Sequence, residues 1–182
     1  GLNSSGRSPR AWTRQRFAGL KAMPTYGWDT VTVPGAVQAW VALSKRLGKL
    51  PFADLFEPAI AYAESGYPVS PIIARRWQDA QARYPDFAEI NRTFFPGGRA
   101  PRPGETFRCP EQAATLSAIA ESRGEAFYRG ELAEAMAACA AAGGGALTLT
   151  DLENHRADWV EPVAVDYRGV RLHEIPPNGQ GI

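Results

Sequence analysis

The sequence predicts a mainly α-helical chain that ends in a β hairpin. Apolar residues recur at three- and four-residue spacing in several segments, as they do in amphipathic helices. Towards the end of the chain the period changes to two, which is typical of strands. Hydrophobic residues make up 45% of the 182 residues, enough to bury a core. We expect a single partial domain over 1–182: a basic irregular lead-in at 1–32, a helical layer at 33–160, and a β hairpin and turn at 161–182.

The lead-in carries clustered positive charge. All its cationic side chains precede the first acid, Asp29, and they are Arg7, Arg10, Arg14, Arg16 and Lys21. Such a cluster is commonly a solvated surface, and the alternative is an anion-binding segment. Over the whole chain 20 basic and 19 acidic groups leave a net charge of +1, so we expect no nucleic acid partner. No run approaches the roughly 18 apolar residues of a spanning helix, so we expect no membrane insertion.

Four to six helices are expected in the helical layer. The first begins at Pro34 and is ended by Gly48. A second apolar stripe covers 50–66, and Pro58 inside it predicts a kink or two short helices, because proline removes a backbone donor. Ser70 is expected to cap a third helix, with Pro71 at its first position.

The third helix is expected to run to about Tyr84, where Pro85 ends it. Residues 91–108 are rich in proline and glycine and are predicted to form a loop. Further helices are predicted from Pro110 to Gly124 and over 131–142.

Phe127 and Tyr128 are expected in a short turn between these two helices. After the second of them, Thr150 and Glu153 have the spacing of a capping box.

The end of the chain predicts two strands around Arg168 and Gly169. A lone hairpin is marginal in water, so we expect it to pair with a sheet that is mostly outside these residues. The turn-forming run from Pro176 to Gly181 should also lead into further structure. The chain is therefore interpreted as an internal piece of a longer protein.

The sequence contains no self-contained catalytic motif. It has no G-x-S-x-G, Walker-type loop, H-E-x-x-H or C-x-x-C. Two histidines and two cysteines are a poor inventory for a metal site, so we predict no metal and no cofactor. His155, expected in a helix, and His173, expected in a strand, are candidate bases that are more often structural. Cys109 is predicted to be a packed thiol, the alternative being a thiol activated at a helix start, and Cys139 a buried one.

Four carboxylates, Asp151, Glu153, Asp158 and Glu161, are dense in the sequence. Helix capping and the helix dipole account for the first two, so no acid–base pair is predicted there.

Several segments together resemble one family, the γ-glutamyltranspeptidases (γ-glutamyltransferases). In the family's order they are Pro34-Gly35-Ala36-Val37, Gly48-Lys49-Leu50-Pro51-Phe52 with Pro58-Ala59-Ile60, Gly66-Tyr67-Pro68-Val69, Phe127-Tyr128-Arg129-Gly130, Leu147-Thr148-Leu149-Thr150-Asp151-Leu152, Asp166-Tyr167-Arg168-Gly169 and Pro176-Pro177-Asn178-Gly179-Gln180-Gly181. Each motif alone is weak, and their common order makes the resemblance specific.

The resemblance implies that the parent is an α+β N-terminal-nucleophile hydrolase with an αββα sandwich. Such a precursor cleaves itself into a large and a small chain, and the new N-terminal Thr of the small chain attacks with its own α-amine as base. The parent would take a γ-glutamyl group from glutathione or a related amide and pass it to water or an amino acid. That Thr would lie beyond Ile182, so no catalytic residue is expected here, and the fragment alone is expected to be inactive. Its partner would be the small subunit of the same precursor.

One substrate-binding position is implied within the chain. Family members carry an Arg in R-E-x-A-P that grips the substrate α-carboxylate, a task that suits the guanidinium fork. Aligned on Pro9, that position holds Ser5, and Arg7 follows two residues later. A two-residue shift in an extended strand keeps the same face, so Arg7 is the candidate for the α-carboxylate, the alternative being a solvated or structural Arg.

The substitution by Ser5 leaves other functions open. The parent could be an amidase or acylase of different acyl specificity, similar to a cephalosporin acylase. A non-catalytic helical interaction domain is the alternative from another class. Localisation also stays open; the resemblance allows export to the periplasm.

Overall fold

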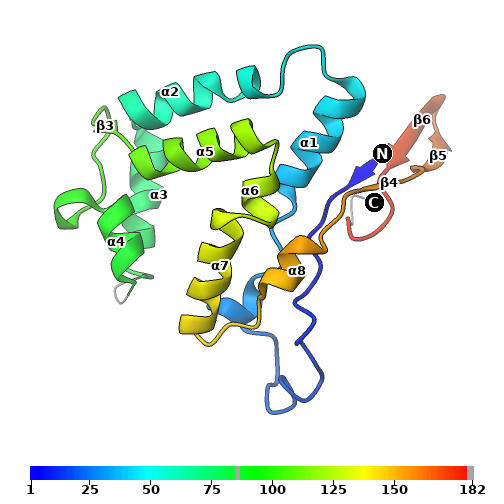
Figure 1. The fold of residues 1–182 in the computed structure, drawn as a ribbon, viewed down its shortest axis with the longest axis horizontal. Coiled ribbons are helices and arrows are strands. Elements are labelled where there is room, and N and C mark those ends of the chain that lie inside the picture. The colour runs from blue at the N-terminus through cyan, green and yellow to red at the C-terminus, as the bar shows by residue number, and fades with distance from the viewer. Residues whose placement is uncertain (85–86, 180–182) are drawn as a thin grey trace. The chain divides into compact units, whose positions relative to one another are not determined.

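The structure, a computed structural model, describes residues 1–84 and 87–179. The described chain is largely helical, with short two-stranded sheets (Figure 1). This confirms the prediction of a mainly α chain with a C-terminal hairpin. The chain contacts divide it into two compact units: Gly1–Phe52 with Ala118–Ile182 form the first, and Ala53–Ser117 form the second. The subdivision into lead-in, helical layer and hairpin stays a prediction.

The first unit contains most of the helical core. Its elements are η1 (Trp28–Thr30), α1 (Ala36–Leu47), the end of α5 (Pro110–Ser122), α6 (Glu125–Tyr128), α7 (Glu131–Ala142) and α8 (Leu149–Glu153). The side chains of Val37, Tyr128, Ala133, Ala140 and Leu152 are almost completely buried among these helices. Small alanine side chains let α7 pack closely against its neighbours.

The strands of the first unit form two separate antiparallel pairs. β1 (Leu2–Asn3) pairs with β4 (Asp158–Trp159), so the start of the chain lies beside the segment that follows α8 (Figure 1). β5 (Val163–Tyr167) and β6 (Val170–Glu174) form the predicted hairpin, with Tyr167 opposite Val170. Arg168 and Gly169 have φ angles of 48° and 82°, the left-handed pair that a tight hairpin turn requires.

The second unit is a smaller helical group. It comprises η2 (Ala53–Leu55), α2 (Glu57–Ser65), β2 (Tyr67–Pro68), α3 (Pro71–Gln81), α4 (Ala88–Phe94), η3 (Pro96–Gly98), β3 (Thr106–Phe107) and the start of α5. Its core gathers buried Val69, Ala74 and Phe107, with Trp77 and Cys109 packed against them. The Trp77 and Phe107 rings meet at 4.7 Å between centroids in an edge-on arrangement.

Several predicted helix ends are confirmed. α1 ends at Gly48, and Pro58 stands in the first turn of α2, after the separate turn η2. The hydroxyl of Ser70 accepts a hydrogen bond from the Ile73 amide, so Ser70 caps α3 as expected. α7 has its predicted bounds.

Other expectations were wrong. α3 ends at Gln81 rather than near Tyr84, and Pro85 lies outside the described residues. The predicted loop at 91–108 contains the end of α4, the turn η3 and strand β3, which pairs with β2. That pairing joins residues about forty positions apart, which local patterns do not reveal. The expected turn at Phe127 and Tyr128 is the short helix α6.

The predicted capping box was placed one half-turn too late. Thr148, not Thr150, caps α8: its hydroxyl accepts from the Asp151 amide, and the Asp151 carboxylate accepts from the Thr148 amide at 3.0 Å. Both pairs have the right spacing, but a start at Thr148 puts Leu147 and Leu152 at the positions of a hydrophobic staple. Both leucines are buried, at 4% and 0% exposure, which explains the choice.

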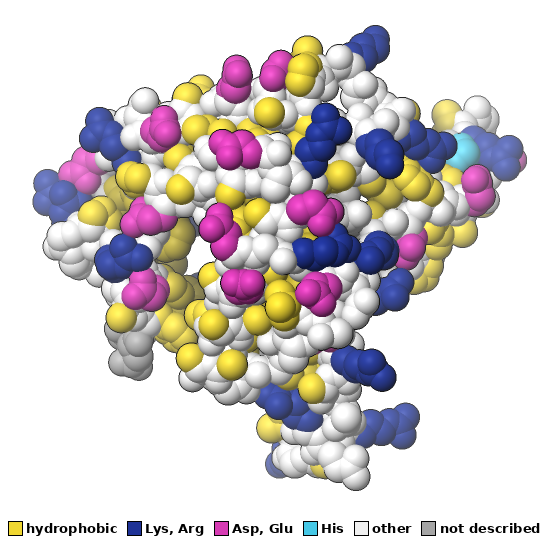
Figure 2. Space-filling view, viewed as in Figure 1, with side chains coloured by type: hydrophobic (Ala, Val, Ile, Leu, Met, Phe, Trp, Pro, Cys, Tyr) yellow, Lys and Arg dark blue, Asp and Glu magenta, His cyan; other side chains and the backbone are white. Residues whose placement is uncertain are grey.

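The surface agrees with the charge pattern of the sequence. Figure 2 shows Lys and Arg side chains gathered over the lead-in loop at the bottom of the view. Within residues 1–84 and 87–179, every helix is too short or too polar to cross a bilayer.

Candidate functional site

The Arg7 cleft is an open hollow in the first unit with a volume of about 630 Å³. It lies between the lead-in and α8, and is lined by Gly6, Arg7, Ser8, Arg10, Val33, Thr150, Asp151, Asn154, His155 and Asn178. The two arginines of this lining, Arg7 and Arg10, belong to the basic cluster of the lead-in. The cleft therefore combines cationic groups with a buried imidazole.

The segment that carries Arg7 is clamped by close backbone contact. The Val33 amide donates to the Arg7 carbonyl at 3.0 Å. A Cβ on Gly6 would overlap the Val33 carbonyl, and a Cβ on Gly35 would overlap the Ser4 carbonyl. Only glycine allows these backbones to approach so closely at both crossings.

α8 is fixed to the lead-in at its first turn. The Asp151 carboxylate accepts a hydrogen bond from the Arg10 amide at 2.9 Å, in addition to its bonds with Thr148. Partial burial acts to raise the pKa of Asp151, but these hydrogen bonds from Thr148 and Arg10 outweigh it, so the pKa lies below its usual value. Asp151 is therefore a structural carboxylate, as the capping interpretation required.

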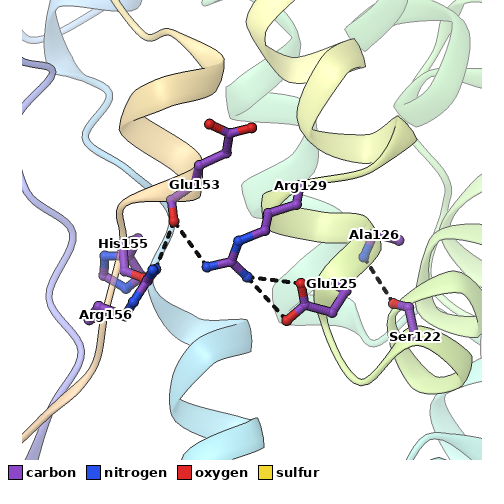
Figure 3. Close-up of polar contacts among 7 residues, drawn as sticks. All are labelled: Ser122, Glu125, Ala126, Arg129, Glu153, His155 and Arg156. Atoms are coloured by element: carbon purple, nitrogen blue, oxygen red, sulfur yellow. Dashed lines mark hydrogen bonds and ion pairs between the residues drawn. The ribbon is translucent and has the colours of Figure 1, made fainter.

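The last turn of α8 is fixed by two guanidinium groups (Figure 3). The Glu153 carbonyl accepts from Arg129 at 3.0 Å and from Arg156 at 2.7 Å. Arg129 also grips the Glu125 carboxylate through both oxygens, at 3.1 and 2.9 Å. Cations suit the carbonyl end of a helix. With both ends of α8 anchored, His155 just after it has a defined place.

Arg7 itself points into open surroundings. Its guanidinium lies 3.4 Å from the Asp158 carboxylate, and both side chains are mostly exposed. An exposed pair of this kind contributes little to stability, so Arg7 remains available to another anion. Ser5, at the position where the resemblance expects Arg, is also exposed. Glu161 is exposed as well, and it lies outside the lining of the cleft.

The two histidines have different surroundings. His155 is 3% exposed and follows α8, so the expectation that it lies within a helix was wrong. It stacks on Tyr128, with ring centroids 5.5 Å apart. Burial, and then the charges of Arg7 and Arg156, lower the pKa of His155. His173 lies exposed on β6, far along the chain from any residue of the cleft lining except Asn178.

The cysteines differ from each other in burial. Cys109 is half-buried beside the core of the second unit, which agrees with the packed-thiol prediction. Cys139 is exposed, so the prediction of a buried thiol was wrong. α7 buries the face that contains Ala133 and Ala140, and Cys139 lies about 100° around the helix from Ala140. Among residues 1–84 and 87–179, no three His, Cys, Asp or Glu side chains gather as a metal site.

Sequence reasoning missed Ser4 and the role of Tyr128. The buried Tyr128 hydroxyl donates to the Pro34 carbonyl at 2.7 Å and accepts from the Gln38 amide at 3.1 Å. Burial raises the pKa of Tyr128 despite the bond from Gln38. Tyr128 and Pro34 each belong to a motif that resembles the family. Their presence in these motifs was the sequence signal that could have drawn attention to the contact between them.

Comparisons with known proteins agree on one family. The gamma-glutamyltranspeptidase family model matches residues 1–182. The chain is 41% identical to the glutathione hydrolase-like YwrD proenzyme of Bacillus subtilis (strain 168) over 183 residues, covering 98% of this chain and 34% of that protein. It spans about a third of the length of that relative.

Solved structures give the same result. A cephalosporin acylase from Bacillus halodurans matches with a TM-score of 0.94 and 49% identity, over 100% of this chain and 35% of that one. The Helicobacter pylori gamma-glutamyltranspeptidase matches with a TM-score of 0.92 and 28% identity, over 97% of this chain and 52% of that one. The motifs, the fold and a match along the whole sequence therefore agree: this chain belongs to the gamma-glutamyltranspeptidase family.

Proposed function

We propose that the parent protein is a Thr-nucleophile enzyme that hydrolyses or transfers a γ-glutamyl group from a glutathione-type amide. The observation that carries the substrate assignment is Arg7, a mostly exposed guanidinium that lines a cleft on a clamped segment next to Pro9. Family membership supports the reaction type.

Within this proposal Arg7 holds the substrate carboxylate. A guanidinium fork can donate two parallel N–H bonds to two carboxylate oxygens, which fixes orientation as well as position. Between substrates the guanidinium can pair with the Asp158 carboxylate 3.4 Å away. Arg10 adds a second positive charge to the lining.

The chemistry belongs to the small subunit of the same precursor. Its N-terminal Thr hydroxyl attacks the amide carbon, the α-amine takes the hydroxyl proton, and the amine leaving group departs with a proton. The resulting acyl ester is then resolved by water or by an amino acid. The parent fold is the αββα sandwich, and residues 1–182 without the small subunit are inactive.

A related acylase is the second candidate. Ser5 stands where the family pattern has Arg, and the cephalosporin acylase from Bacillus halodurans shares 49% identity with this chain. Such an enzyme would keep the Thr mechanism and accept an acyl group without an α-amino acid head.

The test uses the full-length precursor. Intact mass and N-terminal sequencing should give two chains, the smaller beginning with Thr. Hydrolysis of γ-glutamyl-p-nitroanilide is then compared with that of N-glutaryl-p-nitroanilide, which keeps a carboxylate but lacks the α-amino group. Preference for the first supports the γ-glutamyl assignment, and preference for the second supports the acylase. A single uncleaved chain without turnover would refute both and favour a binding domain.

Variants of two arginines test the assigned residue. Arg7→Gln should raise KM about 10- to 150-fold, since a hydrogen bond to a charged group contributes about 1.5–3 kcal/mol. Arg14→Gln is the matched control, because Arg14 is another exposed arginine of the lead-in and is not part of the cleft lining. A KM within twofold of wild type for Arg7→Gln would remove Arg7 from the site.

A further inference from the structure

His155 is unusual because a polar ring is buried without full satisfaction. It is 3% exposed, and its Nδ1 has no hydrogen-bond partner. The Tyr128 ring stacked on it cannot help, because the Tyr128 hydroxyl is already bonded to Pro34 and Gln38. A buried imidazole nitrogen without a hydrogen-bond partner costs free energy. We therefore expect the hydrogen bond of the other ring nitrogen to have a structural role.

That contact is with Ser4, and counting protons fixes its direction. The Ser4 hydroxyl lies 2.7 Å from the Gly35 carbonyl, which can only accept, so the hydroxyl proton is used there. Nε2 of His155 lies 3.4 Å from the same hydroxyl oxygen and must therefore be the donor. The ring is then the Nε2–H tautomer, and the unpartnered Nδ1 carries only a lone pair. This agrees with an Nδ1 that faces no acceptor.

Ser4 begins the segment that carries Arg7. It is held by His155 on one side and by the Gly35 backbone on the other, and Val33 donates to the Arg7 carbonyl three residues later. His155 in turn is fixed by α8, whose two ends are anchored by the Arg10 amide and by Arg129 with Arg156. These contacts connect α8 through His155 to the segment that carries Arg7.

We propose that His155 is a positioning residue of the Arg7 cleft, which as the Nε2–H tautomer holds the Ser4–Arg7 segment where Arg7 can meet a carboxylate. It does not touch the substrate. The part of the proposal that concerns substrate rests on the proposed function, whereas the ordering of the segment does not.

Protonation of His155 would weaken this arrangement. The second N–H would form at Nδ1, where no acceptor is present. The charged groups that act on the ring are Arg7 from the lead-in and Arg156 and Asp158 after α8. Arg10 and Asp151 line the same cleft, and Tyr128 stacks on the ring. Arg7 and Arg156 oppose a positive ring, and Asp158 favours it less strongly. The segment should therefore loosen as the pH falls below about 6.5, the ordinary pKa of histidine.

The first experiment measures order in the segment, using the full-length protein. Hydrogen exchange of the Val33 amide, expressed as a protection factor, reports the bond to Arg7. His155→Phe keeps the stacked ring but removes the donor, and Ser4→Ala removes its acceptor. His155→Phe should speed exchange of Val33 about 2- to 12-fold, the range for one lost hydrogen bond. Ser4→Ala also loses the bond to the Gly35 carbonyl and should speed exchange by at least as much. His155→Gln, which retains a donor, should restore much of the protection.

Controls separate positioning from general stability. Val69→Ala removes buried side-chain volume in the second unit, where Val69 is 1% exposed, and should leave Val33 exchange unchanged. Protection in the wild type should fall with acid, and in His155→Phe it should not. Wild-type exchange at Val33 in both folded variants, or an imidazole that carries its proton on Nδ1 in ¹⁵N spectra, would overturn the proposal. If His155→Phe does not fold, the proposal is tested by Val33 exchange in Ser4→Ala together with the His155 tautomer measured in the wild type.

The second experiment links the segment to the cleft. His155→Phe and Ser4→Ala should raise KM for the better of the two p-nitroanilides severalfold, with kcat within twofold, and the double variant should be no worse than Ser4→Ala. Faster exchange without a change in KM would overturn the link to Arg7. If the wild-type parent hydrolyses neither amide, the proposed function fails, and the exchange result still decides whether His155 positions the segment.

Discussion

Alanine in place of Gly35 should loosen the crossing that holds the segment of Arg7. A Cβ at this position would overlap the Ser4 carbonyl and come within 3.1 Å of Nε2 of His155. The first neighbour is backbone, which cannot move aside as a flexible side chain does. Forcing extra volume into packed structure costs about 1–3 kcal/mol. The hydrogen bond from the Ser4 hydroxyl to the Gly35 carbonyl contributes a further ~0.5–1.5 kcal/mol if it is broken.

The expected destabilisation of Gly35→Ala is therefore about 1.5–4.5 kcal/mol. Urea unfolding of the full-length protein, followed by tryptophan fluorescence, measures it. Gly19→Ala is the control, because nothing lies within 4 Å of a Cβ built there. That control should stay within about 1 kcal/mol of wild type. A free energy of unfolding for Gly35→Ala within about 0.5 kcal/mol of wild type would refute the close approach and the clamp built on it.

The remaining predictions concern single interactions. Asp158→Asn removes the carboxylate that lies 3.4 Å from the Arg7 guanidinium. It should lower KM for a carboxylate substrate by at most about fivefold, because an exposed ion pair contributes about 0.2–1 kcal/mol. A KM higher than that of the wild type would contradict this prediction. Thr148→Ala should cost about 1 kcal/mol by losing the helix cap, and Thr150→Ala far less, as thermal unfolding would measure; equal losses would contradict the assigned cap. Hydrogen bonds from the Arg99 side chain and then from the Arg102 amide lower the pKa of Glu105 from 4.5 to about 2. This carboxylate therefore stabilises the fold above pH 4.5, and the effect is lost as the pH falls towards 2. An NMR titration of Glu105 checks this, and Arg99→Gln should raise the pKa; a midpoint near 4.5 in wild type would contradict it.

Local signals predicted several helix ends correctly, and they did so for physical reasons. Ser70 can cap a helix through its own hydroxyl, and Gly48 can end one, without help from distant residues. The hairpin turn at Arg168 and Gly169 is equally local. Where two local signals were equivalent, as with Thr148 and Thr150, the choice depended on tertiary burial of the neighbouring leucines, which spacing alone does not encode.

The cleft could be predicted only in part. Arg7 was identified because it departs by two residues from a known pattern. Its supporting contacts were not, because Ser4 and His155 are 151 positions apart and the Arg10 amide and Asp151 are 141 apart. The type and local sequence of one residue in such a pair do not identify the other. Backbone donors such as the Arg10 amide leave no trace in side-chain identity at all.

The motifs that identify the family have a common structural role in this chain. Tyr128 of one motif donates to Pro34 of another, and Asp151 of a third accepts from the lead-in backbone. Gly35, beside Pro34, allows the crossing with Ser4. These residues join the lead-in, α1, α6 and α8 rather than perform chemistry. Ser5, where the resemblance expects Arg, lies outside these contacts. The acyl specificity proposed for the parent could therefore differ while the contacts between the motifs stay intact.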